Sequence, residues 1–459
     1  MSLSLPFLTA EKASLKIAQG QLTTVELLQA CLRRIEDREP SIHAWQYLKL
    51  DQALQQAATW DKQNRTFGTT DRLTAPHPLS GIPIAVKDIF ATVDMPTGWG
   101  TAIYRGRYLD HEAAVVTRLK QAGAIILGKT VTTELATAAA GPTTNPHNLT
   151  HTPGGSSSGS AAAVADGMVP LAIGSQTMGS ILRPAAYCGI FGFKPSFGLI
   201  SRDGMMPVSR DLDHVGVFAR GLGDIQLLLD VLIGQDDQDP ECQGYGDLEH
   251  SREDPSWALR LAFIKTPRWE KAEAVMKSRL SEAISVLERA DISIEPVVLP
   301  PELAGYWGHV QDLCAYGLWH NHGSLLATHG EQCSPVLRAW FLRGQQISAS
   351  HYDSLSQCRQ HYQHILKPFF DHYDAFLTPV TLGPAPLGLA NTGSPIFCGL
   401  WTLCGLPALN LPLGQTDKGL PLGCQLVGAP YADQKLLWIA RHCWPILRDA
   451  FGDIQRPLS

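Results

Sequence analysis

Apolar and polar positions along the chain follow two different periods, and the longer one predicts the first helix. From Val25 to Ile35 apolar side chains recur every three to four positions, which is typical of an amphipathic helix. Thr23 and Glu26 form a capping-box pattern that places the start of this helix at about residue 24. We expect it to end near residue 37.

The shorter period first appears in residues 81–88, where apolar side chains alternate with their neighbours. Ile82, Ile84 and Val86 fall on one face, which predicts a strand that ends at Lys87. Because the adjoining residues are apolar, we expect the lysine to be surrounded by apolar side chains.

Helix-like and strand-like segments then alternate, which is the rhythm of an α/β fold. Helices are predicted at 115–122, 161–165, 222–237, 277–291, 300–375 and 433–447, and strands at 124–129, 169–173, 407–413 and 420–427. The sequence contains no internal repeat and no linker. We therefore expect one α/β/α sandwich over residues 1–459, with a mixed central β-sheet flanked by helices.

The composition supports a large interior and excludes several classes of protein. Apolar residues make up 44% of the 459 residues and charged residues 17%, against about 25% charged in an average domain. This balance excludes a disordered chain. The formal net charge is −6 and Lys and Arg form no long cluster, so we expect no nucleic-acid partner.

Neither a membrane segment nor a metal site is indicated. No run of 18 apolar residues occurs, and residues 1–10 lack the basic start of a signal peptide, so we expect a cytoplasmic protein. The ten cysteines include no C-x-x-C pair, which favours reduced, buried thiols. His320, His322, His361 and His364 lack an H-E-x-x-H or carboxylate frame, and we expect no metal and no cofactor.

Two segments rich in Gly and Ser, at residues 141–160 and 174–180, carry the candidate chemistry. Backbone N–H groups in such turns can converge on a developing negative charge, although a plain flexible loop is an equal interpretation. Neither G-x-x-x-x-G-K-[ST] nor G-x-G-x-x-G occurs in residues 154–160, which argues against a phosphate site. A formal G-x-S-x-G around Ser157 lacks the strand that should precede such a nucleophile.

Three consecutive motifs resemble those of the amidase signature family. They are Gly154-Gly-Ser-Ser-Ser-Gly-Ser160, Gly174-Ser-Gln-Thr-Met-Gly-Ser180 and the segment from Arg183-Pro-Ala-Ala-Tyr to Phe193-Lys-Pro195. The resemblance covers residues 5–445 and is weakest between 240 and 375. It implies a signature core at about 80–220 and a variable helical pocket region at about 240–375.

The resemblance also implies a Ser–cis-Ser–Lys triad at Lys87, Ser156 and Ser180. Ser180 would be the nucleophile, Ser156 on a cis peptide would relay the proton, and Lys87 would be the general base. A lysine acts as a base only when neutral, and burial favours the neutral form. The other interpretation of Lys87 is a salt bridge to Asp88.

The same resemblance assigns the oxyanion hole to backbone N–H groups of Thr177, Met178, Gly179 and Ser180. Most members of the family have Gly at the position of Met178, an acidic residue at that of Gln176 and Arg at that of Leu182. A backbone N–H is kept by any residue except Pro, so we expect Met178 to shape the pocket and leave oxyanion binding intact.

We therefore expect a cofactor-free hydrolase that cleaves the C–N bond of a small-molecule amide, or a carbamate or ester, through an acyl-enzyme on Ser180. One alternative is the A subunit of a tRNA-dependent glutamine amidotransferase, which needs a companion chain. Another is an inactive binding scaffold. The sequence leaves the acyl group, the leaving amine and a homodimer open.

Overall fold

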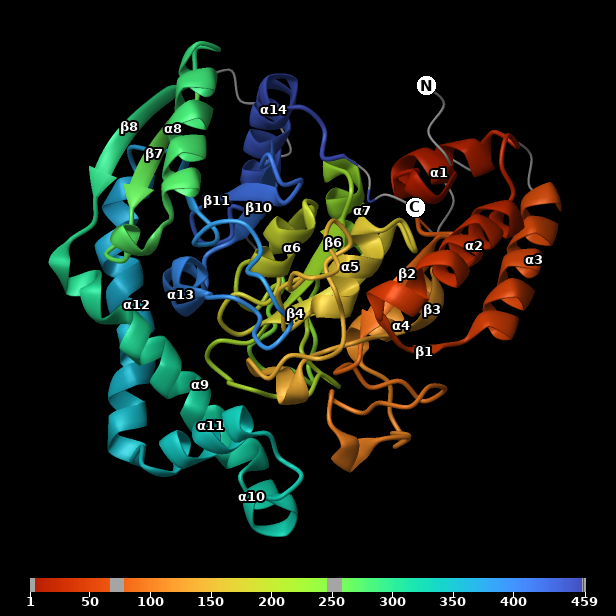
Figure 1. The fold of residues 1–459 in the computed structure, drawn as a ribbon, viewed down its shortest axis with the longest axis horizontal. Helices are drawn as coiled ribbons and strands as arrows, with labels where there is room; N and C mark the ends of the chain where they lie inside the picture. The colour runs from red at the N-terminus through yellow and green to blue at the C-terminus, as the bar shows by residue number, and fades with distance from the viewer. Residues whose placement is uncertain (1–4, 67–77, 246–257, 456, 458–459) are drawn as a thin grey trace.

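The computed structural model describes residues 5–66, 78–245, 258–455 and 457. An eleven-stranded mixed sheet runs through these residues (Figure 1). Its strands, from edge to edge, are β1 (Trp45–Leu48), β3 (Ile125–Thr130), β2 (Pro83–Lys87), β4 (Leu171–Gln176), β6 (His214–Ala219), β5 (Phe191–Lys194), β10 (Ala408–Gln415), β11 (Pro421–Val427), β9 (Ala375–Pro379), β7 (Arg260–Lys265) and β8 (Ser293–Val298). The predicted α/β architecture with a mixed sheet flanked by helices is confirmed.

Helices flank the sheet and include each helix predicted from the sequence. They are α1 (Ala10–Ala18), α2 (Thr24–Ile42), α3 (Leu50–Thr66), α4 (Ala114–Gln121), α5 (Ser158–Ala165), α6 (Leu182–Cys188), α7 (Leu222–Leu232), α8 (Ala274–Glu288), α9 (Tyr306–His322), α10 (Ser324–His329), α11 (Pro335–Gln345), α12 (Ala349–Phe370), α13 (Ile396–Leu403) and α14 (Asp433–Phe451). Helices α9 to α12 form an arm that extends away from the sheet (Figure 1).

Alternate residues of the central strands pack into two separate apolar clusters. In β2, Ile84 and Val86 belong to the cluster that includes α4 and α7, whereas Ala85 belongs to the cluster that includes α2, α3 and α5. In β4, Ile173 and Ala172 divide in the same way. Both faces of the sheet are therefore covered, and a side chain at the end of a central strand has little access to solvent.

Several predicted boundaries differ from the structure; α7, for example, ends at Leu232 and not at residue 237. The N-terminal helix α2 begins at its capping box as predicted, with both Thr23–Glu26 bonds formed, but continues to Ile42. Residues 174–176, predicted as part of a turn, extend strand β4 because they pair with residues 214–216 of β6. Pairing with a distant strand here overrides the local preference of Gly and Ser for turns.

Candidate active site

Lys87 is the last residue of β2 and is completely buried. Strand β2 lies between β3 and β4 and runs parallel to both, so the carboxyl ends of all three strands meet at one edge. From this edge the Lys87 Nζ donates hydrogen bonds to Ser156 Oγ at 2.7 Å and to Ser175 Oγ at 2.9 Å.

The possible salt bridge between Lys87 and Asp88 is not formed. The Asp88 carboxylate instead lies 3.3 Å from the ammonium of Lys129, a second buried lysine. Lys87 makes no ion pair with any carboxylate in the described part of the chain. Its amine is therefore hydrogen-bonded to two hydroxyls.

Burial lowers the pKa of Lys87 well below its ordinary value, and the buried guanidinium of Arg183 lowers it further. The carboxylate of Asp213 acts in the opposite direction and raises the Lys87 pKa. Because desolvation is the largest of these effects, the structure favours a neutral amine at position 87. This is the protonation state that a general base requires.

Ser156 lies just before α5, after a peptide bond from Gly155 that is cis. A side chain at Gly155 would meet Thr392 and Thr133, with a Cβ only 2.8 Å from Thr392 Cγ2. The Gly155 carbonyl accepts a hydrogen bond from Arg183. The chain around Ser156 is thus enclosed on several sides, which fixes its hydroxyl next to Lys87.

Ser175 is a contact of Lys87 that the sequence did not predict. It lies in β4, and its side chain is nearly as buried as that of Ser156. The parallel register of β2 and β4, which pairs Val86 with Ile173, brings it beside Lys87. No motif spacing relates residues 87 and 175, so only the sheet order reveals this contact.

The segment from Thr177 to Ser180 follows β4 and leads into α6. In the described chain, the backbone N–H groups of Met178, Gly179 and Ser180 have no acceptor. Gln176 Oε1 accepts instead from the next two N–H groups, those of Ile181 and Leu182. Three backbone donors beside the candidate nucleophile are therefore left without a protein acceptor in the described chain.

Helix α13 closes over this segment. Gln176 Nε2 donates to Thr402 Oγ1 at 2.9 Å, and Thr402 Oγ1 lies 3.3 Å from the carbonyl of Met178. A Cβ at Gly179 would lie 2.7 Å from Pro395 Cβ, so this close approach requires glycine. The Met178 side chain is half-buried against the core.

The structure joins two of the three predicted triad residues by a hydrogen bond. Ser180 is buried, with 7% of its surface exposed, but within the described chain no hydrogen bond links it to Ser156 or Lys87. Ser157, the serine of the formal G-x-S-x-G, is hydrogen-bonded to the backbone of Ser175. Its hydroxyl donates to the Ser175 carbonyl and accepts from the Ser175 N–H.

Two of the four histidines noted in the sequence lie against backbone carbonyls. His322 Nε2 lies 2.7 Å from the carbonyl of Pro207, and His320 Nδ1 lies 2.9 Å from that of Tyr316. No group of three or more His, Cys, Asp or Glu residues able to hold a metal ion occurs in the part of the chain described. All ten cysteines are free thiols, and only Cys358 is more than slightly exposed.

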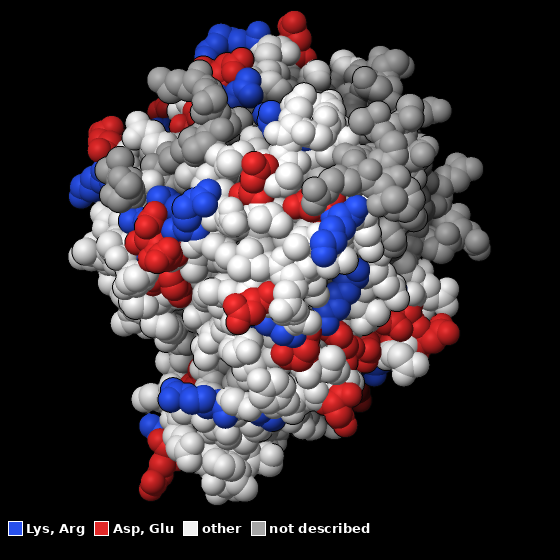
Figure 2. Space-filling view, turned by 90° about the vertical axis from the view of Figure 1, so that its right-hand side faces the viewer, with Lys and Arg blue, Asp and Glu red and all other residues white. Residues whose placement is uncertain are grey.

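Charged side chains of both signs are mixed on the molecular surface. Figure 2 shows one face, on which basic and acidic residues are interspersed among uncharged ones. No helix within the described residues combines the length and hydropathy needed to cross a membrane.

Comparison with known families places this fold and site. The profile of the Amidase family matches residues 26–437. The chain belongs to this family of amidase-signature enzymes, which act on C–N bonds.

Its relatives include components of amidotransferases. The A subunit of glutamyl-tRNA(Gln) amidotransferase from Symbiobacterium thermophilum is 34% identical over 471 residues, covering 94% of this chain and 95% of the relative. The corresponding A subunit from Chloroflexus aggregans is 33% identical over 474 residues, covering 94% of this chain and 95% of the relative.

Similar solved structures include a peptide amidase and a chain from a protein complex. Native peptide amidase from Stenotrophomonas maltophilia has a TM-score of 0.81 and 26% identity, with 99% of both chains covered. A chain from a vestigial protein complex that reveals the origins of an s-triazine catabolic enzyme has a TM-score of 0.85 and 26% identity, covering 98% of this chain and 100% of that one.

Proposed function

We propose that this chain hydrolyses the C–N bond of a small amide through an acyl-enzyme on Ser180. The observation that carries this proposal is the buried Lys87 amine, 2.7 Å from the hydroxyl of Ser156 and without a carboxylate partner among the described residues. Such a lysine can take a proton from a hydroxyl, which an ammonium ion cannot do.

In the acylation step the Ser180 oxygen attacks the amide carbonyl carbon. Its proton passes to Ser156, whose own proton passes to Lys87. The relay requires the Ser180 hydroxyl to donate to Ser156. The N–H groups of residues 178–180, in the segment that Thr177 begins, stabilise the oxyanion.

When the C–N bond breaks, the leaving amine takes the proton back along the same relay from Lys87 through Ser156. Water then attacks the Ser180 ester, giving its proton to the relay. The carboxylic acid leaves, Ser180 recovers its proton, and Lys87 is neutral again. This catalytic cycle consumes the amide and one water molecule and uses no cofactor.

Purified protein should release ammonia or an amine from at least one member of a panel of aliphatic, aryl, carbamate and amino-acid amides. Replacing Ser180 or Lys87 by Ala should lower kcat by at least about 1000-fold, because both are needed for the attack. Ser160→Ala, which removes a buried hydroxyl in α5, is the matched control and should keep most activity. Undiminished turnover by Ser180→Ala would refute the proposal.

The second candidate is the A subunit of a glutamine amidotransferase. The identities of 33–34% over nearly the whole chain favour it. This function uses the same chemistry at Ser180, but glutamine is the amide and the ammonia is passed to a companion protein. Glutamine hydrolysis that depends on a co-purifying chain would support it, whereas hydrolysis of other amides by the isolated chain favours the first proposal.

A further inference from the structure

Thr177 begins the segment that carries the proposed oxyanion hole, and its side chain is anchored outside that segment. Thr177 Oγ1 donates a hydrogen bond of 2.6 Å to Asp213 Oδ1, and both residues are buried. Asp213 directly precedes β6, whose first residue, His214, pairs with Gln176 at the end of β4. The contact therefore lies one position beyond the last paired residues of the two strands.

The Asp213 carboxylate is itself held in place by its own turn. Its Oδ2 accepts hydrogen bonds from the backbone N–H groups of Val208 at 2.8 Å and Ser209 at 2.9 Å. The Asp213 N–H donates back to the Ser209 carbonyl at 2.9 Å. One carboxylate thus joins the turn at residues 208–213 to Thr177.

This turn is packed against the helical arm. Ser209 Oγ donates to the Leu313 carbonyl in α9 at 3.2 Å. Tyr352 in α12 donates to the side chain of Asp211 at 2.7 Å. Because the turn is fixed by β6 and by two helices, Asp213 is the anchored partner and Thr177 is the residue that is positioned.

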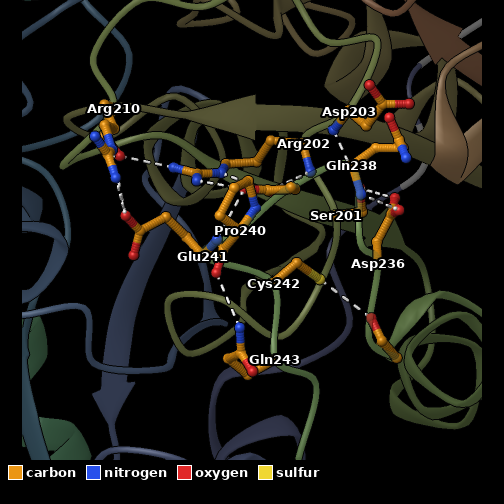
Figure 3. Close-up of polar contacts among 12 residues, drawn as sticks. Ser201, Arg202, Asp203, Arg210, Asp236, Gln238, Pro240, Glu241, Cys242 and Gln243 are labelled. Atoms are coloured by element: carbon orange, nitrogen blue, oxygen red, sulfur yellow. Dashed lines mark hydrogen bonds and ion pairs between the residues drawn. The ribbon is translucent and has the colours of Figure 1, made fainter.

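The two arginines that line a cavity with Asp213 are paired with other carboxylates. Asp213, Arg202 and Arg210 line a cavity of about 190 Å³. Arg202 donates to both carboxylate oxygens of Asp239, at 2.9 and 2.8 Å, and to the Arg210 carbonyl, while Arg210 pairs with Glu241 at 2.8 Å (Figure 3). Within the described chain, Thr177 is the side chain that donates to Asp213.

We propose that Asp213 is a positioning residue for amide hydrolysis, acting through the Thr177 hydroxyl to hold the N–H groups of residues 178–180 toward the oxyanion. The inference rests on the proposed function. Oxyanion donors are effective only when they are fixed before the reaction, and a displacement of about 1 Å can lower a rate about 100-fold. Their N–H groups have no acceptor within the described chain, so the segment is held by its carbonyls and by its first side chain: Thr402 contacts the Met178 carbonyl, and the anchor at Thr177 fixes the start of the segment.

The test measures the rate at which a fluorescent fluorophosphonate labels Ser180, because the phosphoryl oxygen of this probe occupies the oxyanion hole. Thr177→Val, Asp213→Asn and Asp213→Glu should lower the maximal labelling rate of folded protein by about 10- to 100-fold. The half-saturating probe concentration should change less than about threefold. Thr177→Ser keeps the hydroxyl and should label at nearly the wild-type rate.

The double variant Thr177→Val with Asp213→Glu should be no slower than the slower single variant, since both changes break one contact and the charge that acts on Lys87 is kept. Additive losses, or wild-type rates in Asp213→Glu and Thr177→Val, would overturn the role of Asp213. Asp213→Glu keeps the carboxylate but moves it by one methylene. This variant tests the positioning role if the other variants unfold.

Ser180→Ala separates this inference from the proposed function. If that variant is labelled as fast as the wild type, Ser180 is not the nucleophile and the proposed function fails. If Ser180→Ala abolishes labelling while the Thr177 and Asp213 variants label normally, only the positioning role fails.

Discussion

Ser175 lies 2.9 Å from the amine of Lys87 and gives that amine a second hydroxyl acceptor beside Ser156. A primary amine that is hydrogen-bonded to two fixed hydroxyls is held in one orientation. With a single hydrogen bond, the amine would be free to rotate about the axis of that hydrogen bond. When a neutral Lys87 donates an N–H to Ser175, its lone pair can face Ser156, and the Ser156 hydroxyl then turns to donate its proton to the amine. Ser175 thus orients the base, even though it does not touch the bond to be cleaved.

Ser175→Ala should lower kcat about tenfold, because it removes one of two contacts that orient the base. Ser160→Ala is a suitable control, since its hydroxyl is equally buried but bonds to Thr130 and to the Ile173 carbonyl. Steady-state kinetics on the best amide of the panel checks this prediction. Equal losses in both variants would show that the effect is one of packing.

Lys87→Met should raise the free energy of unfolding at pH 7 by about 2 kcal/mol, because a buried amine is replaced by an apolar side chain of similar length. In the unfolded chain the lysine binds a proton up to about pH 10.4, whereas in the folded chain its pKa is well below that. At pH values between the folded and the unfolded pKa of Lys87, the unfolded state binds more protons. The free energy of unfolding of the wild type therefore rises with pH in this range. The advantage of the variant should therefore shrink toward pH 10.

Urea unfolding at several pH values measures this difference. Lys129→Met is the matched control, because Lys129 is also buried but pairs with Asp88. Its removal leaves a buried carboxylate without its partner and should destabilise the protein by about 3–5 kcal/mol. If the Lys87 variant were less stable than the wild type at every pH, the neutral state of the amine would be refuted.

Arg183→Gln should move the acid limb of the pH profile of kcat/KM to higher pH. The Arg183 guanidinium lowers the Lys87 pKa, so its loss lets that pKa rise and leaves less neutral base at a given pH. At pH values below the Lys87 pKa, kcat/KM of the variant should be about tenfold lower than that of the wild type for each unit by which this pKa rises. Arg183→Lys keeps the positive charge and should leave the limb near its original position; an unmoved limb in the Gln variant would contradict the prediction.

Met178→Gly should broaden the range of amides that are hydrolysed. The thioether is half-buried next to the nucleophile, and its removal opens space without removing a backbone donor. We expect kcat/KM for bulky amides to rise several-fold relative to small ones. Met178→Leu preserves the apolar volume and should keep the wild-type ranking, and an unchanged ranking in the Gly variant would show that Met178 does not shape the pocket.

The sequence by itself determined the local elements and the identity of the candidate triad. The capping box at Thr23 and Glu26 fixed the start of α2, and apolar alternation placed Lys87 at a strand end. These features depend on neighbours within a few residues, where periodicity and capping act. The family motifs then indicated Ser156 and Ser180 as the partners of Lys87.

Only the tertiary structure decided which distant groups meet. Lys87 reaches Ser175, and Thr177 reaches Asp213, because the sheet order places β2, β4 and β6 side by side. The same pairing turned residues 174–176 from an expected turn into strand. Such contacts join residues 36 to 88 positions apart, and their energies arise from strand register and shared burial, which no local pattern encodes.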